Sequence, residues 1–212
     1  MIEPTVSSPT DPLLPEQGFD WELFWAEHRT KIIAGGLVVV LAIIGTVSWL
    51  FLNAMNVQAA ENALALAKDA AAFESIASKF AGTPSGGDAL LLLAAARRDA
   101  GDLAASSAAF ERFLKAWPKS ELAAGALLGI GQNLDAGGKP KEAMETYDRL
   151  SAQYPGSYAA PFAELSKAEI LARDFRRDEA RRVLEAITTK YPESPVARMA
   201  AAQLSRIPAA TN

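Results

Sequence analysis

Four aromatic residues recur along the chain at intervals of 37 positions. Phe80 is the first, and Trp117, Tyr154 and Tyr191 follow at the same spacing. Two further columns of large residues keep this spacing, which shows that the chain contains an internal repeat. These columns are Phe73, Phe110, Tyr147 and Leu184, and Ile76, Phe113, Leu150 and Ile187. A repeat of this kind predicts an extended array that serves as a binding surface.

Each repeat is expected to hold two antiparallel helices, which makes the fold all-α. Offsets of three and four residues, as in Phe110, Phe113 and Trp117, place side chains on one stripe of a helix. Proline directly follows three of the aromatic residues and ends the second helix of each unit there. The three columns are therefore predicted to form the repeat core. The first helices are predicted at 87–100, 121–136, 158–172 and 195–206.

The segment from Ile32 to Leu52 has 21 residues without a charge and indicates a membrane span. At 1.5 Å per residue, a helix of this length covers roughly 30 Å, the thickness of a hydrocarbon core. Soluble core helices rarely run so far without a polar face. A cleaved signal peptide is the main alternative, but its apolar region is usually about 7–15 residues long. We expect an uncleaved, single-pass anchor.

The residues at the ends of this span predict its orientation. Two basic residues precede the span, whereas the next one after it is Lys68. Because Lys and Arg stay on the cytoplasmic side, we expect a cytoplasmic N-terminus and, in a bacterial inner membrane, periplasmic repeats. A partner-binding role for the helix before the span is the alternative to interfacial anchoring. The predicted membrane-interface residues are Trp21, Trp25, Arg29, Lys31 and Trp49.

Four prolines near the N-terminus indicate a disordered tail. No Gly or Pro occurs from Thr46 to Ala81, so the membrane helix is expected to continue to about Ala67. Asp69 could cap a second helix that ends at Phe80, although one unbroken helix is also compatible with the sequence. The predicted organisation is a cytoplasmic tail at 1–19, a juxtamembrane and transmembrane helix at 20–56, a repeat domain at 57–207 and a tail at 208–212.

Composition argues against several kinds of chemistry. The absence of cysteine excludes disulfides, zinc–thiolate sites and cysteine nucleophiles. The single histidine, His28, lies at the membrane edge and completes no recognisable triad or metal site. Six acids and two bases in residues 1–31 account for the whole net charge of −4, so the rest offers no basic field for nucleic acid. We therefore expect neither an enzyme nor a cofactor.

The Ala143-x₃-Tyr147 pattern, followed by Tyr154-Pro155-x-Ser157, resembles tetratricopeptide repeats of the bacterial envelope type. This resemblance covers about residues 57–207 and implies an α-solenoid. With the acidic tail and single span, the whole chain resembles the ancillary SecYEG translocon subunit family. That resemblance implies a membrane-anchored periplasmic adaptor for protein partners, namely translocon subunits and secreted or chaperone clients. The Tyr-Pro-x-Ser pattern is also similar to that of the cell-division coordinator CpoB.

The first helices are the predicted binding surface, because they usually line the concave side of such an array. Steps of 37 residues give two polar columns there, Gln132 with Glu169 and Arg98 with Asp135. These four residues are candidates for binding an extended peptide, and a merely solvated helix surface is the alternative.

The Arg-rich run from Arg173 to Arg182 is interpreted as a solvated face with local ion pairs, and a patch for an acidic partner is its alternative. For the whole protein, the alternative function is a cell-envelope assembly or division factor that self-associates through its repeats.

Overall fold

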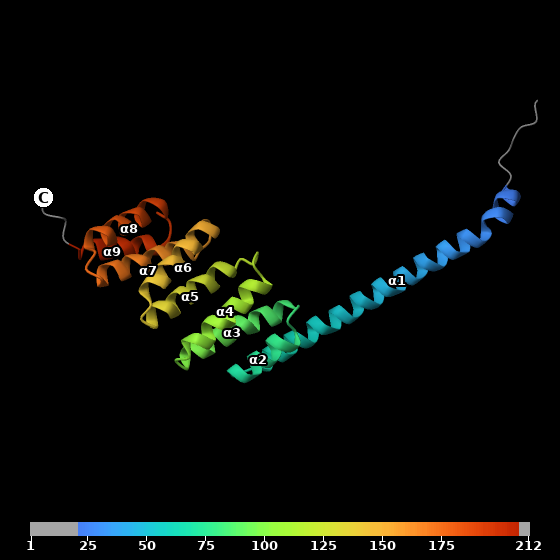
Figure 1. Cartoon of the computed structure of the whole chain (residues 1–212), viewed down its shortest axis with the longest axis horizontal. Helices are drawn as coiled ribbons and strands as arrows, with labels where there is room; N and C mark the ends of the chain where they lie inside the picture. Colours follow the sequence, from blue (N-terminus) through green and yellow to red (C-terminus); the bar gives the residue numbers. More distant parts are fainter. Residues whose placement is uncertain (1–20, 208–212) are drawn as a thin grey trace, which may run out of the picture. The chain divides into compact units, whose positions relative to one another are not determined.

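The computed structural model describes residues 21–207, and helices are the regular elements of this part of the chain. The tails predicted at 1–19 and 208–212 lie outside the described residues. The chain divides into one unit that ends at Leu52 and a second that begins at Asn53. Figure 1 shows the helices α1 to α9 in chain order.

Helix α1 runs from Trp21 to Leu66 and contains the whole predicted span. It is long and apolar enough to cross a membrane, and its most apolar 18-residue window has a mean hydropathy of 2.4. No residue of that window is buried inside the protein. Apolar side chains that meet no protein partner are unfavourable in water, so this composition suits a lipid environment.

The stretch between the span and the repeats contains a helix break, as the Asp69 cap predicts. Helix α1 ends at Leu66, and α2 covers Ala70–Lys79. The Asp69 carboxylate accepts a hydrogen bond of 2.8 Å from the Ala72 amide and so caps α2. The alternative of one unbroken helix is therefore wrong. Ala60, in the last turns of α1, is fully buried in a cluster that includes Ile76.

The remaining helices alternate between the two positions of a helical hairpin. The first helices are α3 (Pro84–Asp99), α5 (Ala123–Ala136), α7 (Ala160–Arg173) and α9 (Pro195–Leu204). The second helices are α2, α4 (Leu103–Ala116), α6 (Pro140–Gln153) and α8 (Arg177–Lys190). From α2 onward each helix packs on the next, and α5 also contacts α7, as α7 does α9. The second helices therefore flank the first helices (Figure 1).

Three of the first helices begin a few residues away from their predicted positions. Helix α3 starts earlier, at Pro84, because the Thr83 hydroxyl accepts a hydrogen bond of 3.1 Å from the Gly86 amide. Helices α5 and α7 start later, at Ala123 and Ala160, because a short turn precedes each of them. Proline suits the first position of α3, because an N–H at that position would have no acceptor within the helix and its absence costs nothing.

The turns inside the hairpins share one backbone geometry. Gly101 and Gly138 have φ angles of 80° and 75°, which glycine adopts without steric cost. Phe175 holds the corresponding position of the third turn with φ 60°. In each turn the following amide donates to the carbonyl five positions back, as Arg176 does to Leu171 at 2.9 Å. Phenylalanine therefore stands where the other two turns use glycine.

The column residues lie in the interior of the repeat unit or at its edge. Tyr147, Leu150, Leu184 and Ile187 are each no more than 1% exposed. Phe73 and the aromatic residues at the ends of α4, α6 and α8 are half-buried. The other column residues are buried, namely Ile76, Phe80, Phe110 and Phe113. The large side chains thus fill the spaces between helices and leave the binding surface to other residues.

Candidate functional site

Arg98, the first predicted groove residue, connects two neighbouring first helices. Its Nε donates to the Asn133 side-chain oxygen at 2.7 Å, and its Nη1 donates to the Gln132 side-chain oxygen at 3.0 Å. A third hydrogen bond of 2.7 Å reaches the Gly129 carbonyl. Arg98 lies on α3 and its three acceptors on α5, so the structure brings two predicted groove residues together.

The other two predicted groove residues make the same kind of connection further along the array. Asp135 on α5 accepts two hydrogen bonds from the guanidinium of Arg173 on α7. Glu169 on α7 accepts a hydrogen bond of 2.9 Å from the Gln203 amide on α9. The predicted groove residues therefore connect successive first helices, and their role in binding a peptide stays a prediction.

Asn133 is a buried polar residue that the sequence analysis did not single out. Its side chain is 2% exposed and donates to the hydroxyls of Ser106 at 2.9 Å and Ser107 at 3.1 Å. Partial burial removes water from the Arg98 guanidinium and lowers its pKa. The sequence contains one indication of this residue. At the 37-residue spacing, Asn133 is equivalent to Ala96 and Ile170, so a polar residue stands where the neighbouring repeats have apolar ones.

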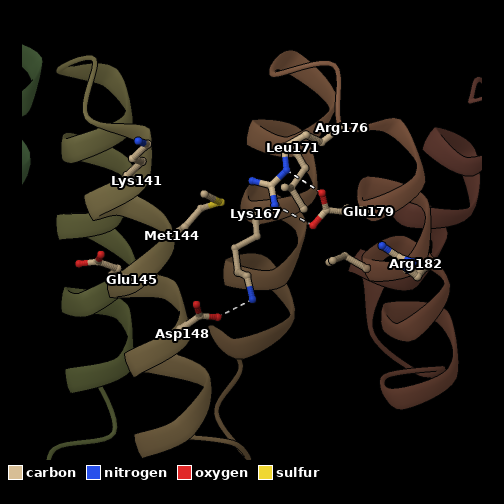
Figure 2. Close-up of a pocket in the computed structure, with 10 residues that line it drawn as sticks. Lys141, Met144, Glu145, Asp148, Lys167, Leu171, Arg176, Glu179 and Arg182 are labelled. Carbon is tan, nitrogen blue, oxygen red and sulfur yellow. Dashed lines mark hydrogen bonds and ion pairs between the residues drawn. The ribbon is translucent and has the colours of Figure 1, made fainter.

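A pocket of about 510 Å³ lies between α6, α7 and α8 (Figure 2). Helices α6 and α8 supply its walls, and α7 supplies the residues between them. This volume lies in the range of about 300–1,000 Å³ that is typical of ligand sites. The lining residues are Lys141, Met144, Glu145, Asp148, Lys167, Leu171, Arg176, Glu179, Arg182 and Val183.

The floor of this pocket is polar where the other repeats are apolar. Lys167 aligns with Leu93 and Ile130, both of which are buried. Glu164, one turn before Lys167 on α7, lines an adjoining hollow and likewise aligns with the buried residues Leu90 and Leu127. These two substitutions place a charged pair on the side of α7 that is a packing surface elsewhere in the array.

Lys167 is held in a network of hydrogen bonds. Its ammonium donates to Asp148 at 2.5 Å and to Glu164 at 3.3 Å, and the Ser151 hydroxyl donates to Glu164 at 2.7 Å. Burial disfavours the charge of Lys167, but the two carboxylates outweigh that effect and raise its pKa. The floor therefore stays charged and fixed in position.

The walls add two exposed cations, Lys141 and Arg182, and the charge of Arg182 also acts on the nearby Glu179 carboxylate. Arg176 is paired with Glu179 through two hydrogen bonds of 2.7 Å. Within residues 21–207, by contrast, Arg182 on α8 and Lys141 on α6 make no hydrogen bond or ion pair. A second hollow of about 290 Å³ continues along α8 and shares Arg182 and Val183 with the pocket.

The predicted membrane-interface residues lie on α1 in the unit that ends at Leu52. Trp21, Trp25 and Trp49 are 71%, 52% and 64% exposed, and Arg29 and Lys31 are also exposed. Exposed side chains are available for interfacial anchoring, and that role stays a prediction. No group of three potential metal-binding side chains occurs in the described part of the chain.

Comparison with known families agrees with this architecture. The model of the tetratricopeptide repeat-like domain matches residues 22–194. Among curated proteins, no sequence matches the chain. The match covers most of the chain and includes the long first helix as well as the hairpins. The protein therefore belongs to the tetratricopeptide repeat-like domain family.

Proposed function

We propose that this protein is a membrane-anchored adaptor whose repeat domain binds other proteins beside a secretory translocon. Its repeats would lie in the periplasm of a bacterium, with the N-terminus in the cytoplasm. Translocon subunits and proteins emerging from the translocon are its proposed partners. The observation that carries this proposal is a tetratricopeptide-like array on the same chain as a long helix whose most apolar segment has no buried residue.

Physical chemistry supports the two parts of the proposal in different ways. Repeat arrays have long surfaces, because each unit contacts only its neighbours, and extended partners can lie along them. A membrane anchor raises the effective concentration of these repeats next to membrane partners, so modest affinities suffice for binding. Arg29 and Lys31, with no basic residue after the span until Lys68, support the proposed orientation.

Crosslinking in intact membranes tests the partners. The full chain and a control that ends after Leu66 would be crosslinked in parallel, and their adducts would be identified by mass spectrometry. We expect translocon subunits and secreted proteins only with the full chain. Equal recovery with the anchor-only control would contradict the proposal, and adducts confined to copies of the chain itself would favour self-association.

Protease protection tests the orientation separately. In spheroplasts, added protease should digest the repeat domain, since the proposal places it outside the cytoplasm. A repeat domain that resists protease until the cells are lysed would overturn the periplasmic placement and leave the protein-binding role untouched.

A further inference from the structure

We infer that the pocket between α6, α7 and α8 binds an extended peptide segment through a carboxylate and a neighbouring apolar side chain. This inference rests on the proposed protein-binding function and names the site and the chemistry of the partner. The predicted site on the first helices is different, since its polar groups are engaged with each other. The pocket lies on the side of the second helices, where polar groups and hollow space occur together.

The charges of the pocket favour a carboxylate. Arg182 and Lys141 stand on opposite walls (Figure 2) and form no hydrogen bond or close ion pair within residues 21–207. Glu179 attracts Arg182 only at longer range, so a ligand can reach both cations without breaking a hydrogen bond. An arginine guanidinium binds a carboxylate through two parallel hydrogen bonds. The floor does not compete for this group, because the Lys167 ammonium already donates to Asp148 and Glu164.

The acidic residues of the pocket limit the charge that a ligand can carry. Glu145 and Asp148 line the α6 wall, and Glu179 lines the α8 wall. A ligand with several negative charges, such as a nucleotide, would meet these carboxylates and be repelled. A single carboxylate next to Arg182 meets less of that repulsion, because the Glu179 carboxylate already accepts two hydrogen bonds from Arg176.

Apolar residues beside the cations favour a peptide over a free small acid. Three apolar side chains line the pocket, Met144 from α6, Leu171 from α7 and Val183 from α8. Methionine is flexible and adapts to irregular partners. The second hollow extends the site along α8 past Ala186 to Tyr191. An extended peptide with alternating acidic and apolar side chains matches the cations and apolar residues that follow one another along the pocket and the second hollow.

Fluorescence anisotropy on the full chain in detergent micelles tests the inference. The probe is a short labelled peptide in which Glu alternates with Leu, and its comparison is the analogue with Gln in place of Glu. Because a hydrogen bond to a charged group is worth about 1.5–3 kcal/mol, we expect the acidic peptide to bind at least about tenfold more tightly. Equal affinity for the two peptides would overturn the inference.

Variants locate the site. Arg182→Gln should lower the affinity for the acidic peptide about tenfold and leave that for the Gln analogue unchanged. Arg177→Gln is the control, because Arg177 is an exposed arginine of the same helix that does not line the pocket. This variant should bind the acidic peptide as tightly as the unchanged protein does. Loss of affinity in both variants, or in neither, would contradict the assignment. Displacement of the peptide by succinate at similar concentration would show a site for free acids instead.

The two proposals fail in different ways. If translocon adducts persist while Arg182→Gln binds the acidic peptide normally, the pocket is wrong and the adaptor function stands. If the peptide binds as expected while the adducts match those of the anchor-only control, the adaptor function is wrong and the pocket stands.

Discussion

The Arg98 guanidinium donates a hydrogen bond of 2.7 Å to the side-chain oxygen of Asn133 and so joins the ends of α3 and α5. The Asn133 amide nitrogen in turn donates a hydrogen bond to the hydroxyl of Ser106, a fully buried residue of α4. Three helices from two hairpins thus meet at one polar residue. A buried polar group that loses its partners retains its desolvation cost, so this connection should matter to the stability of the array.

Replacement of Asn133 should destabilise the repeat domain. Asn133→Ala leaves the Ser106 hydroxyl and one N–H of Arg98 without their present partner, and we expect a loss of about 2 kcal/mol in the free energy of unfolding. The denaturation midpoint, followed by circular dichroism, measures this loss. Asn62→Ala alters an exposed asparagine of α1 and should change stability by less than about 0.5 kcal/mol. Equal midpoints for the two variants would contradict the role of Asn133.

The left-handed backbone at Phe175 should lower the free energy of unfolding of the repeat domain. A left-handed backbone costs a residue with a side chain about 1–2 kcal/mol, whereas glycine escapes this cost. The Phe175 side chain is 82% exposed, so its loss removes little packing. We therefore expect Phe175→Gly to raise the free energy of unfolding by about 1 kcal/mol. Phe175→Ala keeps the strained backbone and should not stabilise; a gain equal to that of the glycine variant would refute this explanation.

Tyr147 should make stability fall at alkaline pH. Burial raises the pKa of its phenol to about 12 in the folded protein, while the unfolded chain ionises near pH 10. Between these values the folded state retains a proton that the unfolded state has lost, so stability falls as pH rises, by up to about 1.4 kcal/mol per pH unit. Tyrosinate absorbance and denaturation midpoints measured over this pH range test the prediction.

A matched pair of variants assigns that alkaline effect. Tyr147→Phe should flatten the dependence of stability on pH, since no phenol is then held neutral at that position. Tyr158→Phe removes a phenol that is 59% exposed and should leave the dependence unchanged. A slope that survives Tyr147→Phe would show that another group causes it.

The charged floor of the pocket should be dispensable for folding and needed for binding. The double variant Glu164→Leu with Lys167→Leu restores the apolar pattern of the other repeats. Well-packed apolar residues often replace a buried ion pair without loss, so we expect stability within about 1 kcal/mol of the unchanged protein. Affinity for the acidic peptide should fall about tenfold, because loss of Lys167 leaves the Asp148 carboxylate unpaired in the pocket, where it repels an acidic ligand. A double variant that binds normally would contradict this role.

The core could be predicted from the sequence because its information is local and periodic. Phe110, Tyr147 and Leu184 share one stripe of the second helix in every unit, and the repeat spacing alone identifies them. The predicted first helix at 87–100 starts later than the observed α3, which begins at Pro84. Its start depends on the hydrogen bond from the Gly86 amide to the Thr83 hydroxyl, which the repeat spacing does not indicate.

The candidate site was harder to predict because it depends on how neighbouring helices face each other. The repeat spacing places Arg98, Asp135 and Glu169 on the first helices. It does not predict the hydrogen bonds that these residues make between helices. One feature of the sequence indicates the pocket, namely charged residues at positions 164 and 167, where the other repeats have apolar residues. Whether such a position opens into a pocket or closes around an ion pair depends on the separation of α6 and α8, which the sequence alone does not specify.

The most direct test of a protein-binding repeat domain at the membrane is photocrosslinking at single positions in the full chain. A photoreactive amino acid at position 183 would report on the pocket, and one at position 149 on an exposed part of α6 outside it. In intact membranes, we predict protein adducts from position 183 that are absent from position 149. Adducts of the same identity and yield from both positions, or no protein adduct from position 183, would contradict the account.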